Sequence, residues 1–196
     1  MNPITHFLVG WVALEKRLES KRDKALVCLA GVVPDFDGMG IGIDFVTRTV
    51  HWAQTDYYQE YHRMLGHGLP AALVIAAAAA AMARQRMRVA VLAFIAVHLH
   101  FLCDLLGSRG STAEDIWPIY YLAPVSSAAE LSWSYQWPLV GWQNMLLSVC
   151  LLLATMARAT VRGYSPVCLV SVAGDAMFVA TLRQWRLRLG GLFRVH

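Results

Sequence analysis

A histidine and a carboxylate stand four residues apart near the end of an apolar stretch, at His100 and Asp104. Side chains at positions i and i+4 lie on one face of a helix, so both can reach the same ion. Imidazole and carboxylate groups are costly in an apolar environment unless a partner balances them. The pair therefore predicts half of a metal site. His98 lies about 200° around the helix from His100, and we interpret it as a structural residue.

Other histidines and acids occur at the ends of separate apolar stretches. If these stretches form an antiparallel bundle, all of their polar ends meet on the side that holds His100 and Asp104. Zinc and similar divalent ions favour imidazole nitrogen and carboxylate oxygen in such an arrangement. The candidates for a site of one or more ions, zinc being the expected metal, are His6, Asp35, Asp37, His62, His67, His100 and Asp104.

The chemistry that such a site suits best is hydrolysis, because a divalent ion turns bound water into a nucleophile near neutral pH. An unligated carboxylate such as Asp37 could act as a general base. Arg63 has two interpretations that the sequence leaves open. It could hold a phosphate or carboxylate of a substrate, or it could pair with a nearby acid and orient a ligand.

Each candidate also has a simpler interpretation. A single histidine at a membrane interface is more often a hydrogen-bonded structural residue than a ligand, and Asp35 is suited to capping the turn after Pro34. Asp44 and His51 lack ligand spacing, so we expect them to be solvated loop residues. A non-catalytic protein with a polar network or a structural metal is therefore the alternative. A transporter or proton relay ranks below it, because the ionisable groups gather at one end instead of lining a path.

The composition indicates an integral membrane protein. Of the 196 residues, 57% are hydrophobic and only 15% are charged, with a mean hydropathy of +0.46. Soluble domains carry about 25% charged residues. The net charge of +4 comes from short basic clusters between apolar segments. We therefore expect membrane lipids as partners and no nucleic acid.

The apolar segments predict the elements that position the candidates. About 20 residues cross a bilayer as a helix, which Val89–Leu106 and Leu139–Ala157 satisfy and Leu69–Ala83 approaches with its flanks. Ile4–Leu14 and Ala25–Val33 are shorter and predict an N-terminal helical hairpin. Val167–Leu182 is interrupted by Gly174 and Asp175. We expect an all-α membrane bundle of about four spanning or near-spanning helices, with residues 1–165 as the site-bearing domain and 166–196 as a C-terminal apolar segment and basic tail.

Charge placement predicts the orientation. Basic residues cluster in 15–24, 84–88 and 158–162, whereas the stretches 34–67 and 104–137 hold nine of the thirteen acids. The positive-inside rule puts the basic turns in the cytoplasm, so the metal site is expected on the non-cytoplasmic side. Tryptophan and tyrosine crowd residues 117–142, which is typical of an aromatic belt. A lining for a lipid-like substrate is the other interpretation.

The motifs together resemble a known family. They are Thr5-His6, Pro34-Asp35-Phe36-Asp37, His62-Arg63 with His67, and His100-x-x-x-Asp104. Over roughly residues 1–140 they resemble the YdjM-type membrane-bound metal-dependent hydrolases, also described as LexA-binding, inner-membrane-associated hydrolases. That family is in turn similar to the all-helical zinc-dependent phospholipase C and nuclease group.

The resemblance implies metal ligation by His6, Asp35, His62, His67, His100 and Asp104, with Asp37 beside them. The resemblance supports the metal site more firmly than any substrate. Taken with the charge placement, it leads us to expect metal-dependent hydrolysis of an ester or phosphoester, including one in a lipid, at the non-cytoplasmic face of the inner membrane. This chain departs from the family pattern at Gly66 and Gly68, where threonine and serine are usual. The departures remove hydroxyls that could orient a ligand.

Overall fold

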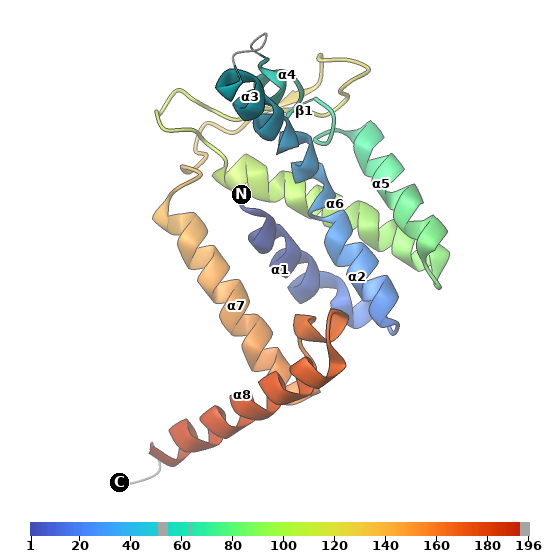
Figure 1. The fold of residues 1–196 in the computed structure, drawn as a ribbon, viewed down its shortest axis with the longest axis vertical. Coiled ribbons are helices and arrows are strands. Elements are labelled where there is room, and N and C mark those ends of the chain that lie inside the picture. Colours follow the sequence, from blue (N-terminus) through green and yellow to red (C-terminus); the bar gives the residue numbers. More distant parts are fainter. Residues whose placement is uncertain (51–54, 63, 193–196) are drawn as a thin grey trace.

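The structure is a computed structural model that describes residues 1–50, 55–62 and 64–192. It is a bundle of helices (Figure 1), so the all-α prediction is confirmed. The elements in chain order are α1 (Pro3–Leu14), η1 (Glu15–Arg17), α2 (Lys21–Ala30), η2 (Val33–Met39), α3 (Gly40–Thr49), α4 (Tyr57–Tyr61), α5 (Leu69–Met82), α6 (Arg86–Gly107), β1 (Ile119–Tyr120), β2 (Glu130–Leu131), α7 (Trp142–Arg162), η3 (Pro166–Leu169) and α8 (Val172–Leu192). The two strands pair antiparallel, with Ile119 opposite Leu131.

Helix α6 is the central element, and it contacts α1, α2 and α5. Its apolar residues at helical spacing, such as Val89, Ala93 and Val97, are fully buried. Helix α5 packs against it and buries a row of alanines that includes Ala72 and Ala76. Small side chains allow two helices to approach closely. The packing fixes α6, and with it the direction in which His100 and Asp104 point.

Two helices are long and apolar enough to cross a membrane within the described residues, namely α6 and α7. Helix α2 together with the η2–α3 stretch satisfies the same criteria as a pair, with a bend of 50° at the break between them. Helix α5 is apolar but has only 14 residues. The expected N-terminal hairpin is present as α1 and α2, which pack against each other.

Two expectations about the elements differ from the structure. The segment from Val167 is divided into η3 and α8, and α8 is not among the described helices that could span. Figure 1 shows α8 leaving the lower end of α7 at a wide angle. Asp44 is not a solvated loop residue, because it is buried in α3 and accepts hydrogen bonds from the backbone N–H groups of Tyr57 and Tyr58. His51 lies outside the described residues.

A buried polar side chain stabilises the turn between α5 and α6. Asp23 is fully buried and accepts hydrogen bonds from the backbone N–H groups of Arg84 and Gln85, at 2.9 and 3.1 Å. The N–H groups at the start of a helix have no intrahelical partner, so a carboxylate from α2 satisfies them here and anchors the α5–α6 turn.

Candidate metal centre

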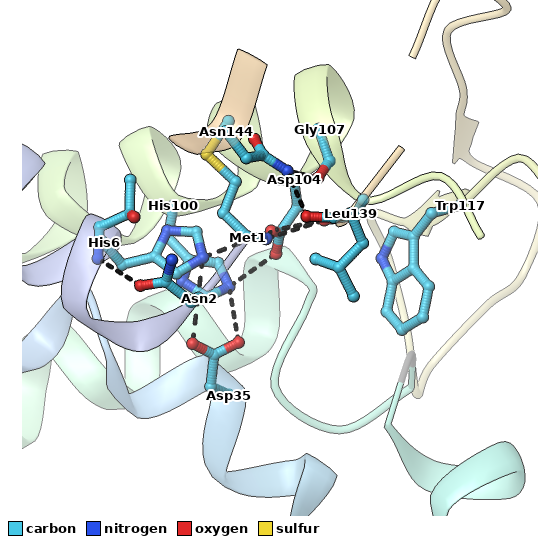
Figure 2. Close-up of polar contacts among 12 residues, drawn as sticks. Met1, Asn2, His6, Asp35, His100, Asp104, Gly107, Trp117, Leu139 and Asn144 are labelled. Atoms are coloured by element: carbon cyan, nitrogen blue, oxygen red, sulfur yellow. Dashed lines mark hydrogen bonds and ion pairs between the residues drawn. The ribbon is translucent and has the colours of Figure 1, made fainter. Parts of the chain in front are cut away.

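Four side chains from three elements meet at one end of the bundle (Figure 2). His6 comes from α1, Asp35 from η2, and His100 and Asp104 from α6. One ligand atom from each of them lies within 4.8 Å of the others. We call these four residues the central cluster. His6, His100 and Asp104 are each no more than 2% exposed, so the cluster is shielded from bulk water.

Local sequence explains how each residue reaches the cluster. Asn2 caps α1 by accepting a hydrogen bond from the Thr5 N–H at 2.9 Å, which places His6 in the first turn. His100 and Asp104 are one turn apart on α6, and Nε2 of His100 lies 3.0 Å from Oδ2 of Asp104. Asp35 is in the 3-10 helix η2, directly after Pro34. Proline has no backbone N–H and its ring clashes with the carbonyl four residues before it, so α2 cannot continue through this position.

The cluster contains polar atoms that lack hydrogen bonds. Both ring nitrogens of His6 and Oδ2 of Asp35 are buried without a hydrogen-bond partner. Nε2 of His6 faces Oδ1 of Asp104 at 3.3 Å and Oδ2 of Asp35 at 3.9 Å. Unpaired buried polar atoms are costly, and two carboxylates share this space. Imidazole nitrogens and carboxylate oxygens directed at a common point form a donor set that fits a divalent metal.

A second group lies beside the central cluster and consists of Asp37, His62 and His67. Asp37 Oδ1 accepts a hydrogen bond from Nδ1 of His62 at 2.6 Å, and Oδ2 accepts one from Nδ1 of His67 at 3.1 Å. The backbone N–H of Gly66 also donates to Oδ2, at 2.8 Å. A carboxylate that holds Nδ1 of a histidine fixes the ring and leaves Nε2 available as a ligand.

His67 joins the two groups. Its Nε2 lies 3.1 Å from Nε2 of His100 and 3.4 Å from Oδ2 of Asp104. Nδ1 of His100 donates to the Gly31 carbonyl at 3.0 Å, so Nε2 of His100 presents its lone pair to the same space. Burial lowers the pKa of His67, but hydrogen bonds with Asp104 and Asp37 outweigh this and raise it to about 9. Nε2 of His67 and Nε2 of His100 thus face each other across a space that a metal ion is suited to occupy.

Asp104 has further contacts on its other oxygen. Ser108, one turn later, donates to Oδ1 at 2.8 Å. The α-amino group of Met1 also contacts Oδ1 and lies 2.8 Å from the Ser108 hydroxyl. Figure 2 shows Met1 beside Asp104, with Leu139 on the side toward Trp117. Oδ1 thus faces His6 while Oδ2 faces His100 and His67, which places Asp104 to contact more than one ion.

A small pocket opens beside the cluster. Its volume is about 50 Å³, and its walls include Asp35 and Asp104 together with Tyr58, Trp117 and Leu139. A site of this size has room for an ion and one or two waters, since a water occupies about 30 Å³ in the liquid. The aromatic walls come from separate parts of the chain that the sequence alone did not connect.

The candidate residues are thus placed as follows. His6, Asp35, His100 and Asp104 meet in the central cluster, and His67 lies at its edge with its Nδ1 held by Asp37. His62 belongs to the second group. Both oxygens of Asp37 accept hydrogen bonds, an arrangement that favours a positioning role, and its role as a general base stays a prediction. Arg63 lies outside the described residues.

The position of His98 agrees with a structural role. Its Nδ1 lies 2.8 Å from the Phe94 carbonyl and its Nε2 lies 3.0 Å from the Tyr121 hydroxyl. The ring therefore ties α6 to the segment that contains β1.

Sequence reasoning missed two residues that hold the end of α6. The Nε2 atom of Gln136, which is 1% exposed, lies 3.0 Å from the Asp104 carbonyl and 3.1 Å from that of Leu105. Asn144 donates to the carbonyls of Gly107 and Leu139, both at 2.8 Å. No motif marks either residue. A single amide in an aromatic-rich stretch was the only available signal.

The fold and the site define a helical membrane protein with a buried histidine–aspartate cluster at one end of its bundle. The chain belongs to the YdjM inner membrane protein family, whose model matches residues 1–186. No curated protein and no solved structure matches it significantly. The family resemblance is confirmed, whereas the likeness to zinc-dependent phospholipase C stays a prediction.

Proposed function

We propose that the protein is a membrane-bound, metal-dependent hydrolase of an ester or phosphoester. The observation that carries the proposal is the central cluster, in which His6 and Asp35 direct buried atoms without hydrogen bonds at Asp104 and His100. Such a donor set suits a divalent ion, and zinc is the ion we expect.

The protein's own residues would share the work of the site. His6, Asp35, His100 and Asp104 would hold one ion, and His67 with Asp104 would contact a second. A bound divalent metal would supply the activation of water and the stabilisation of charge that develops on the substrate.

Neighbouring residues would orient the ligands and the substrate. Asp37 would fix the ring of His67, as the Gly31 carbonyl fixes that of His100. Arg63 is the candidate to hold a substrate phosphate. Tyr58 and Trp117, which line the adjacent pocket, would contact the apolar part of a lipid-like substrate.

The placement in the membrane is part of the proposal. The basic turns would face the cytoplasm and the central cluster the opposite side of the inner membrane, with α6 and α7 among several membrane passes. Membrane lipids would surround the bundle and supply the nearest esters and phosphoesters. Residues 1–165 would form the site-bearing domain.

Metal analysis of the protein purified in detergent is the direct test. We expect stoichiometric zinc, manganese or iron in the wild-type protein, and loss of that metal in His100→Ala and in Asp104→Ala. His98→Gln is the matched control, because it alters a histidine on the same helix that lies outside the cluster, and it should keep the metal. Equal metal content in His100→Ala and His98→Gln would contradict the assignment.

Hydrolysis is tested separately with a phosphodiester, a carboxylic ester and a phospholipid in mixed micelles. We expect turnover of at least one of them by wild-type protein and by His98→Gln, with loss in Asp104→Ala and after chelation. The small pocket favours a second candidate, a non-catalytic protein with a structural metal, because about 50 Å³ leaves little room for substrate. Bound metal whose removal unfolds the protein, without turnover of any probe, would favour that candidate.

A further inference from the structure

A cleft of about 690 Å³ lies at the end of α6 that is remote from the metal centre. One wall is the η1 turn with Lys16 and Arg17, and the other is the first turns of α6 with Arg88 and Val91. His100 follows Arg88 by more than three helical turns, a separation on the order of 20 Å. The cleft is therefore distinct from the central cluster, and nothing in the proposed hydrolysis uses it.

The charge of the cleft is positive. Lys16, Arg17 and Arg88 line it, against one acid, Glu19. Arg17 uses one N–H for the Ala13 carbonyl at 2.6 Å, and Arg88 uses one for the Gln85 side chain at 3.1 Å. A guanidinium has five N–H donors in a planar fork, so both arginines keep donors for a ligand. Arginine and lysine together are suited to a phosphate group.

The cleft also has an apolar side that continues along α6. Val91 lines it and is 52% exposed, and Ile95, one turn further on the same face, is 39% exposed. Helix α6 is long and apolar enough to span a membrane, and a span formed by it would place its first turns at a membrane boundary whichever way the chain is oriented. The cations at that boundary suit the headgroup of a lipid. The exposed apolar row, which runs from them toward the middle of α6, suits an acyl chain.

We propose that this cleft binds an anionic phospholipid, with its phosphate held by Lys16, Arg17 and Arg88. One acyl chain lies along Val91 and Ile95. Basic pockets at the cytoplasmic face of membrane helices suit anionic headgroups, and this cleft lies at the face that the charge distribution assigns to the cytoplasm. The apolar row favours a lipid over a soluble phosphate, because a soluble anion would leave that row without a partner.

The test measures lipid binding to the full-length protein in neutral detergent, by the shift in thermal unfolding on titration with phosphatidylglycerol. We expect stabilisation by phosphatidylglycerol and none by phosphatidylcholine or glycerol phosphate. Each cation adds about 1 kcal/mol near an anionic surface, so the triple variant Lys16→Gln, Arg17→Gln and Arg88→Gln should weaken binding by about fivefold per cation.

A matched triple variant serves as control. Lys21→Gln, Arg22→Gln and Arg84→Gln remove the same charge from neighbouring exposed positions that do not line the cleft, and this protein should keep the wild-type affinity. Glu19→Gln should bind phosphatidylglycerol more tightly, because it removes the acid of the cleft. Equal losses in both triple variants would show general charge attraction and overturn the proposal. Equal stabilisation by glycerol phosphate would overturn the lipid as ligand.

Discussion

Asp35 and Asp37 lie two positions apart in one short run yet belong to different groups. The run forms the 3-10 helix η2, where successive residues are rotated by about 120°. Asp35 therefore faces His6 and His100, whereas Asp37 faces His62 and His67. The sequence indicated both aspartates as candidates. It could not separate their partners, because that depends on whether the run is α-helical, 3-10 or extended.

Glycine is required at position 66 because other backbone and side-chain atoms approach the chain closely there. A Cβ atom at this position would lie 2.5 Å from the Pro34 carbonyl oxygen and 2.8 Å from Oδ2 of Asp37. The departure from the usual threonine therefore has a spatial reason in this chain. The backbone N–H of Gly66 donates to Oδ2 of Asp37 at 2.8 Å, a contact that needs this close approach.

Gly66→Ala should therefore destabilise the protein and weaken metal binding. Relief of the clash would push η2 away from the histidines, at a cost of about 1–3 kcal/mol. Thermal unfolding and metal content measure the two effects. Gly42→Ala is the control, since a Cβ there would meet nothing within 4 Å, and it should be neutral or stabilising. Equal behaviour of the two variants would contradict the close packing at Gly66.

The residues of the central cluster could be predicted from the sequence to different degrees. His100 and Asp104 follow from helical spacing alone. The convergence of His6 and Asp35 on them required the further assumption of an antiparallel bundle. Ser108 and the Gly31 carbonyl could not be inferred, because backbone contacts and hydroxyl contacts leave no motif.

At the scale of elements, the apolar segments predicted α5, α6 and the N-terminal hairpin well. Helix α7 begins at Trp142, three positions after the apolar run starts, since Gly141 and Pro138 precede it. Helix α3 was missed. Its sequence is rich in glycine and follows an acidic run, although Ile41 and Phe45 are exposed and apolar. Short helices give little periodic signal.

The end of α6 depends on a distant loop. Gln136 lies against the carbonyls of Asp104 and Leu105 and accepts the Trp117 N–H at 2.8 Å. The last carbonyls of a helix have no intrahelical partner, so this side chain completes the turn that carries Asp104.

Gln136→Ala should lower the free energy of unfolding by about 1–3 kcal/mol, because it leaves buried backbone groups unpaired. It should also reduce metal retention, since the turn with Asp104 loses its support. Denaturation in mixed detergent micelles and metal analysis provide the measurements. Gln184→Ala alters an exposed glutamine of α8 and should change stability by less than about 0.5 kcal/mol. A normal metal content in Gln136→Ala would argue against the support role.

The whole molecule has polar groups of different kinds at its two ends. The histidine–aspartate groups occupy one end. At the other, Glu15 is 1% exposed and pairs with Arg162 and with Lys24 at 3.7 Å. The Tyr164 hydroxyl donates to Glu15 at 2.7 Å. These contacts join the N-terminal hairpin to α7 and to the turn after it.

Glu15→Ala should destabilise the protein by about 3 kcal/mol, because removal of one partner leaves buried cations without their counter-charge. Glu19→Ala removes the same charge from an exposed position four residues later and should cost less than about 0.5 kcal/mol. Unfolding in mixed micelles compares the two. If they are equally stable, the Glu15 contacts do not hold the hairpin.

The position of Glu15 also affects how the protein is assembled in the membrane. Lys24 is synthesised soon after Glu15, but Tyr164 follows Glu15 by 149 residues. At about 5–20 residues per second, the hairpin waits on the order of ten seconds before its last partners emerge from the ribosome. The contacts of Glu15 with Arg162 and Tyr164 therefore form after the hairpin can already pack against α6. His6, which α1 contributes to the central cluster, belongs to the same hairpin.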